Sequence, residues 1–199
     1  MSQDQHPQQD SKLFPVFLKL AGRRVLLVGA GPVAAGKLRS LLEAGASVTV
    51  VAPEVHDEIA RSGAALVRRE FVAADLDDVF FAVAAATPEV NRQVRSAGEA
   101  RRVFVNAVDD PEAASAYTGG VVRRGGVTIA ISTEGRAPAL AGLLREALAA
   151  LLPEDLESWV AEAQALRARQ RATGISMGQR RPQLLEALNT LYQAKGSAA

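Results

Sequence analysis

A strand, a glycine-rich turn, a helix and a second strand follow one another near the start of the chain, and this order most constrains its fold. The aliphatic run Val25–Val28 is typical of a buried strand, and it leads into Gly29-x-Gly31-x-x-Ala34. Leucines at helical spacing follow, and residues 47–52 have the composition of a second buried strand. This context is typical of a dinucleotide-binding unit, in which the glycines form a tight turn and let the backbone approach a pyrophosphate. The same turn without a ligand is the alternative.

The helix that starts after Gly31 offers unpaired N–H groups and a partial positive charge to a phosphate. Glu54 lies 23 residues beyond Gly31, close to the spacing of ~20 expected for an acid that binds the ribose. No arginine follows it to bind a 2′-phosphate, so NAD is favoured over NADP. Thr87 ends the fourth expected strand, where a cofactor would pass. The alternative role of Glu54 is a solvated surface charge, and that of Thr87 is a turn that ends the strand. The expected cofactor-binding residues are Gly29, Gly31, Pro32, Val33, Pro53, Glu54 and Thr87.

The composition excludes several classes of protein. The 199 residues include 23 Lys and Arg against 22 Asp and Glu, and this net charge of +1 argues against a general nucleic-acid-binding protein. With no cysteine and two histidines, neither a thiolate metal site nor a histidine-rich one is expected. No apolar run reaches membrane-spanning length, and the polar first ten residues lack the apolar core of a signal peptide. We therefore expect a cytoplasmic protein without a membrane or nucleic-acid partner.

Strands and helices continue to alternate over roughly the first 110 residues, which favours a parallel sheet. Pro15 reduces the apolar run at 13–18 to an edge strand or a lead-in segment. Further strands are expected at 66–70, 79–86 and 103–106, with helices at 58–62 and 89–100. The pattern predicts an α/β fold, a Rossmann-like doubly wound parallel sheet.

The pattern changes after Pro111. Residues 121–131 read as two strands joined by a glycine-containing turn, which predicts a β-hairpin. Pro138 then stands near the first turn of an Ala- and Leu-rich helix that runs to Leu152. The rest reads as helical, with one helix ending at Gly174 and another running from Pro182 to Ala194.

Motifs spread along the chain mark a resemblance to one family. They include the Leu-Phe-Pro-Val-Phe opening, the Gly29 turn with Lys37, and the stretches Ala84–Thr87, Asn106–Pro111 and Ala113–Ser115. The most specific stretch is Ser132-Thr133-x-Gly135-Arg136-Ala137-Pro138, which is followed by Leu143–Glu146 and by Met177–Arg181. From about Leu13 to Arg181 the chain resembles the precorrin-2 dehydrogenases, the N-terminal module of siroheme synthase.

The resemblance implies NAD-dependent oxidation of precorrin-2, a tetrapyrrole, to sirohydrochlorin in siroheme or cobalamin biosynthesis. It also implies a homodimer, with an NAD-binding Rossmann domain at 12–117, a dimerisation segment at 118–152 and a helical C-terminal domain at 153–195. The polar, Gln-rich residues 1–11 are expected to form a disordered tail. Some members also insert iron or cobalt, and this second activity is left open here. A Rossmann module that senses NAD without chemistry is the alternative from another class.

Asp109 is the candidate catalytic residue. It follows the fifth expected strand, whose carboxyl end should face the cofactor. Oxidation of a reduced tetrapyrrole releases a proton as well as a hydride, and a carboxylate can accept that proton. Ordinary turn chemistry of Asp-Asp-Pro is the alternative.

The resemblance further implies that arginines bind the many carboxylates of the substrate, although a solvated surface charge is the usual role of any one arginine. The expected substrate-binding residues are Asn106, Ser132, Thr133, Arg136 and Arg145. Two stretches depart from the family. Ala116–Gly120 replaces a Phe-Ile/Val-x-Pro stretch, which leaves the shape of the loop before the hairpin open. Thr133 stands where the family has serine, which leaves a serine-specific role open.

Overall fold

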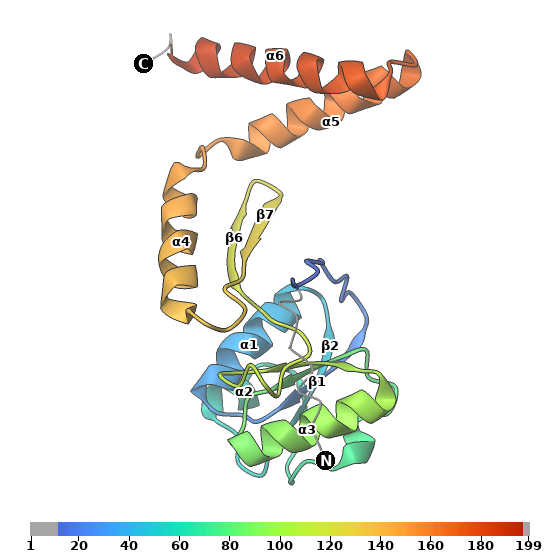
Figure 1. Cartoon of the computed structure of the whole chain (residues 1–199), viewed down its shortest axis with the longest axis vertical. Helices are drawn as coiled ribbons and strands as arrows, with labels where there is room; N and C mark the ends of the chain where they lie inside the picture. Colours follow the sequence, from blue (N-terminus) through green and yellow to red (C-terminus); the bar gives the residue numbers. More distant parts are fainter. Residues whose placement is uncertain (1–11, 197–199) are drawn as a thin grey trace, which may run out of the picture. The chain divides into compact units, whose positions relative to one another are not determined.

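The computed structural model describes residues 12–196, and the chain divides into two compact units (Figure 1). The first unit contains the residues up to Thr118 together with Glu134–Arg136. The second unit contains Gly119–Thr133 and the residues from Ala137 onward. The predicted disordered tail at 1–11 lies outside the described residues, and the predicted three-domain division stays a prediction.

The first unit is built on a parallel sheet with the strand order β3-β2-β1-β4-β5. Its strands are β1 (Arg24–Val28), β2 (Ser47–Val51), β3 (Ala65–Val67), β4 (Phe81–Ala84) and β5 (Phe104–Ala107). Its helices are α1 (Pro32–Glu43), α2 (Asp57–Ala60), the 3-10 turn η1 (Ala73–Leu76) and α3 (Pro88–Arg101). The strand order reverses between β1 and β4, beside the glycine turn, which is where such sheets bind ligands. The predicted doubly wound parallel sheet is confirmed.

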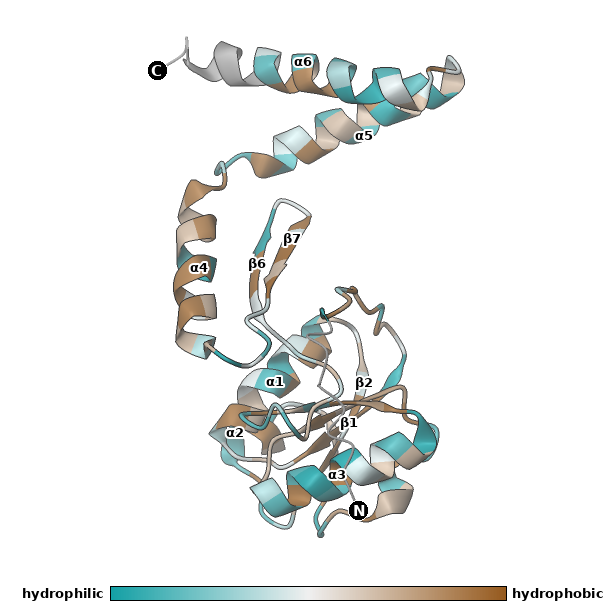
Figure 2. Cartoon of the chain, in the orientation of Figure 1, coloured by the Kyte–Doolittle hydropathy of each residue, from teal (hydrophilic) through white to brown (hydrophobic). Residues whose placement is uncertain are grey.

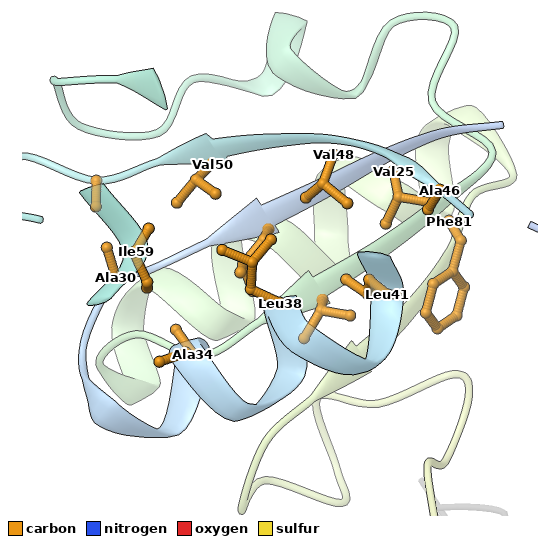
Figure 3. Close-up of a cluster of buried hydrophobic side chains, with 14 of the residues drawn as sticks. Val25, Ala30, Ala34, Leu38, Leu41, Ala46, Val48, Val50, Ile59 and Phe81 are labelled. Atoms are coloured by element: carbon orange, nitrogen blue, oxygen red, sulfur yellow. The ribbon is translucent and has the colours of Figure 1, made fainter. Parts of the chain in front are cut away.

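Helices cover both faces of this sheet, so the strands are buried on both sides. On one face Val25 of β1 shares a buried cluster with Leu38 and Leu41 of α1 (Figure 3). On the other face Leu26 shares a second cluster with Val94 of α3. Burying each side chain of this size contributes about 1.5–3 kcal/mol. Burial on both faces explains why these strands read as continuous aliphatic runs rather than alternating ones.

Two elements of the first unit differ from the sequence-based expectation. β3 ends at Val67, before the charged Arg68 and Arg69. The guanidinium of Arg69 instead binds the carboxylate of Asp75, with an NH1–Oδ2 distance of 2.8 Å. The segment before β1 contains neither strand nor helix from residue 12 to Leu20, so it is a lead-in segment and not an edge strand.

The second unit begins with the predicted hairpin. β6 (Gly120–Arg124) pairs antiparallel with β7 (Val127–Ile131). Gly125 and Gly126 form the turn with φ values of 52° and 79°, a conformation that suits glycine in tight hairpins. α4 (Pro138–Leu151) lies against β6, since a Cβ on Gly120 would be 3.4 Å from the Cβ of Arg145. The predicted hairpin and the helix after it are confirmed.

Two longer helices follow, α5 (Leu156–Ala172) and α6 (Met177–Gly196). The prediction that the last helix begins at Pro182 is wrong, because Pro182 lies inside α6. Proline costs this helix one backbone hydrogen bond, but it does not set its start. The hydroxyl of Ser176 bonds the side chain of Gln179 at 3.1 Å at the start of the helix. Within residues 12–196, no helix combines the length and apolar character that a membrane span needs.

Candidate functional site

The turn after β1 has the geometry of a dinucleotide site. Gly29 has φ of 100°, and a Cβ there would collide with the carbonyl oxygen of Ala85, just beyond β4. Gly31 precedes α1 with φ of −84°, and nothing lies within 4 Å of the place where its Cβ would be. α1 starts at Pro32 without a side-chain cap, so its first N–H groups are available to a phosphate. These residues fit the pyrophosphate of a dinucleotide.

The loop after β2 is tied to this turn. The backbone N–H of His56 donates to the carbonyl oxygen of Ala30 at 3.0 Å. This bond holds the loop that carries Pro53 and Glu54, both of which are exposed. The ribose-binding role of Glu54 stays a prediction, but its loop lies beside the glycine turn.

The loop after β4 forms a third border of the site. The hydroxyl oxygen of Thr87 caps α3 by accepting from the N–H of Val90 at 3.5 Å, a long hydrogen bond. The buried Asn91 holds the same loop, because its side-chain oxygen accepts from the N–H of Ala86 at 3.1 Å. Sequence reasoning missed Asn91, although a polar residue in the first turn of an otherwise amphipathic helix was a usable signal.

Asp109 lies two residues beyond β5, at the carboxyl edge of the sheet. Its φ is 56°, a left-handed conformation that Asp, Asn and Gly adopt more readily than other residues. The neighbouring Asp110 closes the turn, because its Oδ1 accepts from the N–H of Ala113 at 3.1 Å. The turn chemistry of Asp-Asp-Pro therefore belongs to Asp110, and the side chain of Asp109 is exposed at the edge where a ligand would bind.

A chain of hydrogen bonds joins α1 to the loop after β5. Lys37 Nζ donates to Thr118 Oγ1 at 2.7 Å, and that hydroxyl donates to Asn106 Oδ1 at 3.0 Å. Asn106 Nδ2 donates to the carbonyl oxygen of Ala116 at 3.0 Å. Asn106 is buried, and its neighbours in β5 belong to the core on the α3 side, so its side chain faces α1. The amide of Asn106 thus holds the loop, and its predicted contact with substrate stays a prediction.

Lys37 and Asp109 interact electrostatically across this site. The side chain of Lys37 is half-buried, and burial lowers its pKa below the ordinary value of 10.5. The negative charge of Asp109 acts in the opposite direction and favours the ammonium form. Sequence reasoning placed Lys37 in the family motif without giving it a role. The signal was a lone lysine in a helix otherwise rich in alanine and leucine.

Residues Glu134–Arg136 pack onto the loop that carries Asp109. Gly135 has φ of 75°, and a Cβ there would lie 2.7 Å from the ring of Pro111 and 3.5 Å from that of Tyr117. The hydroxyl of Tyr117 donates to the carbonyl oxygen of Pro111 at 3.1 Å and closes the loop. Arg136, which is exposed, pairs with Glu134. The structure therefore brings Arg136 to the unit that holds Asp109.

The other predicted substrate-binding residues belong to the second unit. Thr133 Oγ1 accepts from the N–H of Ala137 at 3.3 Å. Arg145 of α4 pairs with Glu146 at 2.8 Å. Substrate contacts of Ser132, Thr133 and Arg145 stay predictions.

A hollow of about 260 Å³ lies at the opposite, amino edge of the sheet, bordered by Arg24, Thr49 and three aspartates, Asp75, Asp77 and Asp78. Open α/β sheets bind ligands at the carboxyl edge, and the glycine turn, Thr87 and Asp109 all lie there. The carboxyl edge is therefore the candidate site.

The chain matches two family models. One, described as putative NAD(P)-binding, matches residues 16–120. The other, described as sirohaem biosynthesis protein central, matches residues 124–151. The second model confirms the resemblance to the siroheme synthase module, and a nicotinamide dinucleotide is the cofactor class of the first.

The chain is also similar to curated siroheme synthases. Siroheme synthase 2 of Cronobacter sakazakii is 45% identical over 172 residues, which cover 84% of this chain and 38% of that protein. Siroheme synthase 3 of Aeromonas hydrophila is 44% identical, with coverages of 84% and 37%. The chain thus spans less than two fifths of the length of these relatives. The solved structure of the precorrin-2 dehydrogenase SirC matches with a TM-score of 0.66 and 27% identity, covering 87% of this chain and 88% of that one.

Proposed function

Because the chain belongs to the putative NAD(P)-binding family, we propose that it is an NAD-dependent dehydrogenase that oxidises precorrin-2 to sirohydrochlorin. One observation carries the proposal. The glycine turn after β1 and Asp109 after β5 lie at the same edge of one parallel sheet, so a bound dinucleotide and an exposed carboxylate share a site. The resemblance to SirC over most of both chains supports the choice of substrate.

The residues of the turn would hold the cofactor. The free N–H groups at the start of α1 bind the pyrophosphate, and the open space beside Gly31 admits it. Glu54 binds the ribose hydroxyls, and the absence of an arginine in Pro53–Asp57 favours NAD over NADP. When bound, NAD supplies the acceptor for a hydride. We also propose that the reaction takes place in the cytoplasm.

Asp109 acts as the general base. The oxidation removes one hydride and one proton from precorrin-2, and the exposed carboxylate of Asp109 accepts the proton. Asp110 is not suited to this task, because it closes the turn to Ala113. A positioned general base of this kind contributes a factor of about 100 to 10,000 in rate.

Arginines bind the rim of the substrate. Precorrin-2 carries carboxylate side chains, and Arg136 stands on the segment packed against the Asp109 loop. Guanidinium groups pair with carboxylates in a bidentate geometry, which suits them to this role. Arg145, Ser132 and Thr133 complete the proposed substrate contacts from the second unit.

We also propose that the chain forms a homodimer through the segment that contains α4. Most of this helix is apolar (Figure 2). It exposes Leu140, Leu143, Leu144 and Leu151, at 50%, 65%, 41% and 77% of their full surface. Large exposed apolar patches mark interaction sites, and a second copy of the chain is the partner that the family resemblance implies.

A paired assay tests the function. The purified protein is given precorrin-2 and NAD without metal, and in parallel sirohydrochlorin with ferrous iron. Formation of NADH and sirohydrochlorin in the first arm is the expected result. Iron insertion in the second arm would add the chelatase activity that the family leaves open. NAD binding without either reaction would contradict the proposal and favour a sensor.

A further inference from the structure

The ammonium group of Lys37 has hydrogen-bond donors that residues 12–196 of the protein do not use. It carries three N–H donors, and the hydroxyl of Thr118 accepts one of them at 2.7 Å. This is the hydrogen bond that Lys37 makes within residues 12–196. Two donors are therefore left for water or for a ligand at the carboxyl edge of the sheet.

The position of this ammonium is fixed before any ligand arrives. The Thr118 hydroxyl that accepts from Lys37 also donates to the buried Asn106, which is held in turn by the carbonyl of Ala116. Ordering a long lysine side chain costs conformational entropy. Because the bond to Thr118 already orders the side chain, binding of a ligand to the ammonium does not lose that conformational entropy again.

The charge of Lys37 favours the binding of an anionic ligand next to Asp109. Burial disfavours the ammonium form and lowers the pKa of Lys37, while the carboxylate of Asp109 acts in favour of the charged form. Asp109 alone would repel an anionic substrate, because like charges in an interface oppose binding. A cation near it removes that repulsion.

We infer that Lys37 is a substrate-binding residue, which offsets the charge of Asp109 and donates hydrogen bonds to a carboxylate of the tetrapyrrole. This inference rests on the proposed function. A phosphate of the cofactor offers the same anionic oxygens. The bond to Thr118 nevertheless places the ammonium beside the loop after β5, whereas the glycine turn that would hold the pyrophosphate follows β1. This position beside the loop of Asp109 favours the carboxylate of the substrate, and the NAD titration below distinguishes the two.

The test compares two variants of Lys37 with a matched control in the full chain. Lys37→Met keeps the apolar stem and removes the charge, and Lys37→Arg keeps the charge. Arg39→Met is the control, because Arg39 is a cation on the same helix whose NH2 pairs with Glu58 Oε1 at 2.5 Å. Sirohydrochlorin binding is followed by fluorescence titration, and NAD binding by calorimetry.

The Kd for sirohydrochlorin is expected to rise roughly 10- to 100-fold in Lys37→Met, the range for lost hydrogen bonds to a charged group. Lys37→Arg should keep most of the affinity, and Arg39→Met should match the parent. NAD affinity should change less than about threefold in all three, since the pyrophosphate is bound by the N–H groups of α1. If Lys37→Met does not fold, Thr118→Val is the second variant, and it should weaken sirohydrochlorin binding by releasing the lysine.

Unchanged sirohydrochlorin affinity in a folded Lys37→Met protein, or in Thr118→Val where that stands in, would overturn the inference. A selective loss of NAD affinity would also overturn it and assign the ammonium to the cofactor. If the parent binds sirohydrochlorin through Lys37 but does not oxidise precorrin-2, the dehydrogenase proposal fails and the role of Lys37 in binding stands. A parent protein that does not bind the tetrapyrrole would overturn both.

Discussion

Replacing Asp109 by asparagine tests the proposed chemistry with little structural change. Asp109 has φ of 56°, a conformation that asparagine also adopts. Alanine at this position would add roughly 1–2 kcal/mol of backbone strain, so its effect would mix stability with chemistry. Asp109→Asn keeps the size of the side chain and removes its negative charge and its capacity to accept a proton.

The expected loss of turnover follows from the role of a general base. It amounts to about 100- to 10,000-fold, which corresponds to roughly 3–5 kcal/mol in the barrier. NAD affinity should change little, because Asp109 follows β5 whereas the pyrophosphate turn follows β1. Asp110→Asn is the matched control. An amide oxygen can still accept from the N–H of Ala113, so this variant should turn over within a few-fold of the parent.

The assay is steady-state oxidation of precorrin-2 by each folded variant, with NAD titration alongside. Turnover of Asp109→Asn within a few-fold of the parent would remove this residue from the mechanism. A large fall in NAD affinity with unchanged turnover would instead assign it to cofactor positioning. A loss in Asp110→Asn as large as that in Asp109→Asn would show that the loop, and not the base, had been perturbed.

Three further predictions concern the cofactor, the oligomer and stability. Gly31→Val should fold, because φ of −84° and open space accommodate a side chain, but it should raise the Kd for NAD in calorimetry; unchanged affinity would mean that the cofactor site is misplaced. Light scattering at micromolar concentration should give a dimer mass for the parent and a monomer mass for Leu143→Lys, and a monomeric parent would count against the proposed interface. Asp75→Asn should lower the urea midpoint at neutral pH, because the hydrogen bond from Arg69 lowers the pKa of Asp75 from 3.8. A carboxyl group whose pKa is lower in the folded state than in the unfolded state stabilises the fold at pH values above its unfolded pKa. That contribution is lost as the pH falls through the folded pKa. The difference between Asp75→Asn and its parent should therefore shrink below pH 3.8, and a constant difference would refute the link to ionisation.

The sheet could be predicted because its signals are local. The run Val25–Val28 is hydrophobic on both faces of the sheet. Gly29 follows it at a position where any side chain would collide with the carbonyl oxygen of Ala85. The position of Asp109 at the carboxyl edge follows from the parallel order of the strands. Helix boundaries were less predictable, since Pro182 is tolerated inside α6 once the helix around it is formed.

The contacts that shape the candidate site could not be predicted, because they join residues far apart in the chain. The bond between Lys37 and Thr118 spans 81 positions, and no periodicity reports it. Nor does any local pattern show that Asn106 uses its amide to hold a loop. Motifs alone therefore singled out residues without the partners that the structure gives them.

The chain passes between its two units after Thr118, after Thr133 and after Arg136. The first unit is for that reason not a continuous stretch of sequence. A gene fragment that ends at Thr118 would encode the whole sheet yet omit Gly135, whose packing on Pro111 and Tyr117 supports the loop of Asp109. Recombination that moves the dinucleotide unit into another protein must therefore carry the hairpin as well, because the hairpin lies between the two parts of that unit in the sequence.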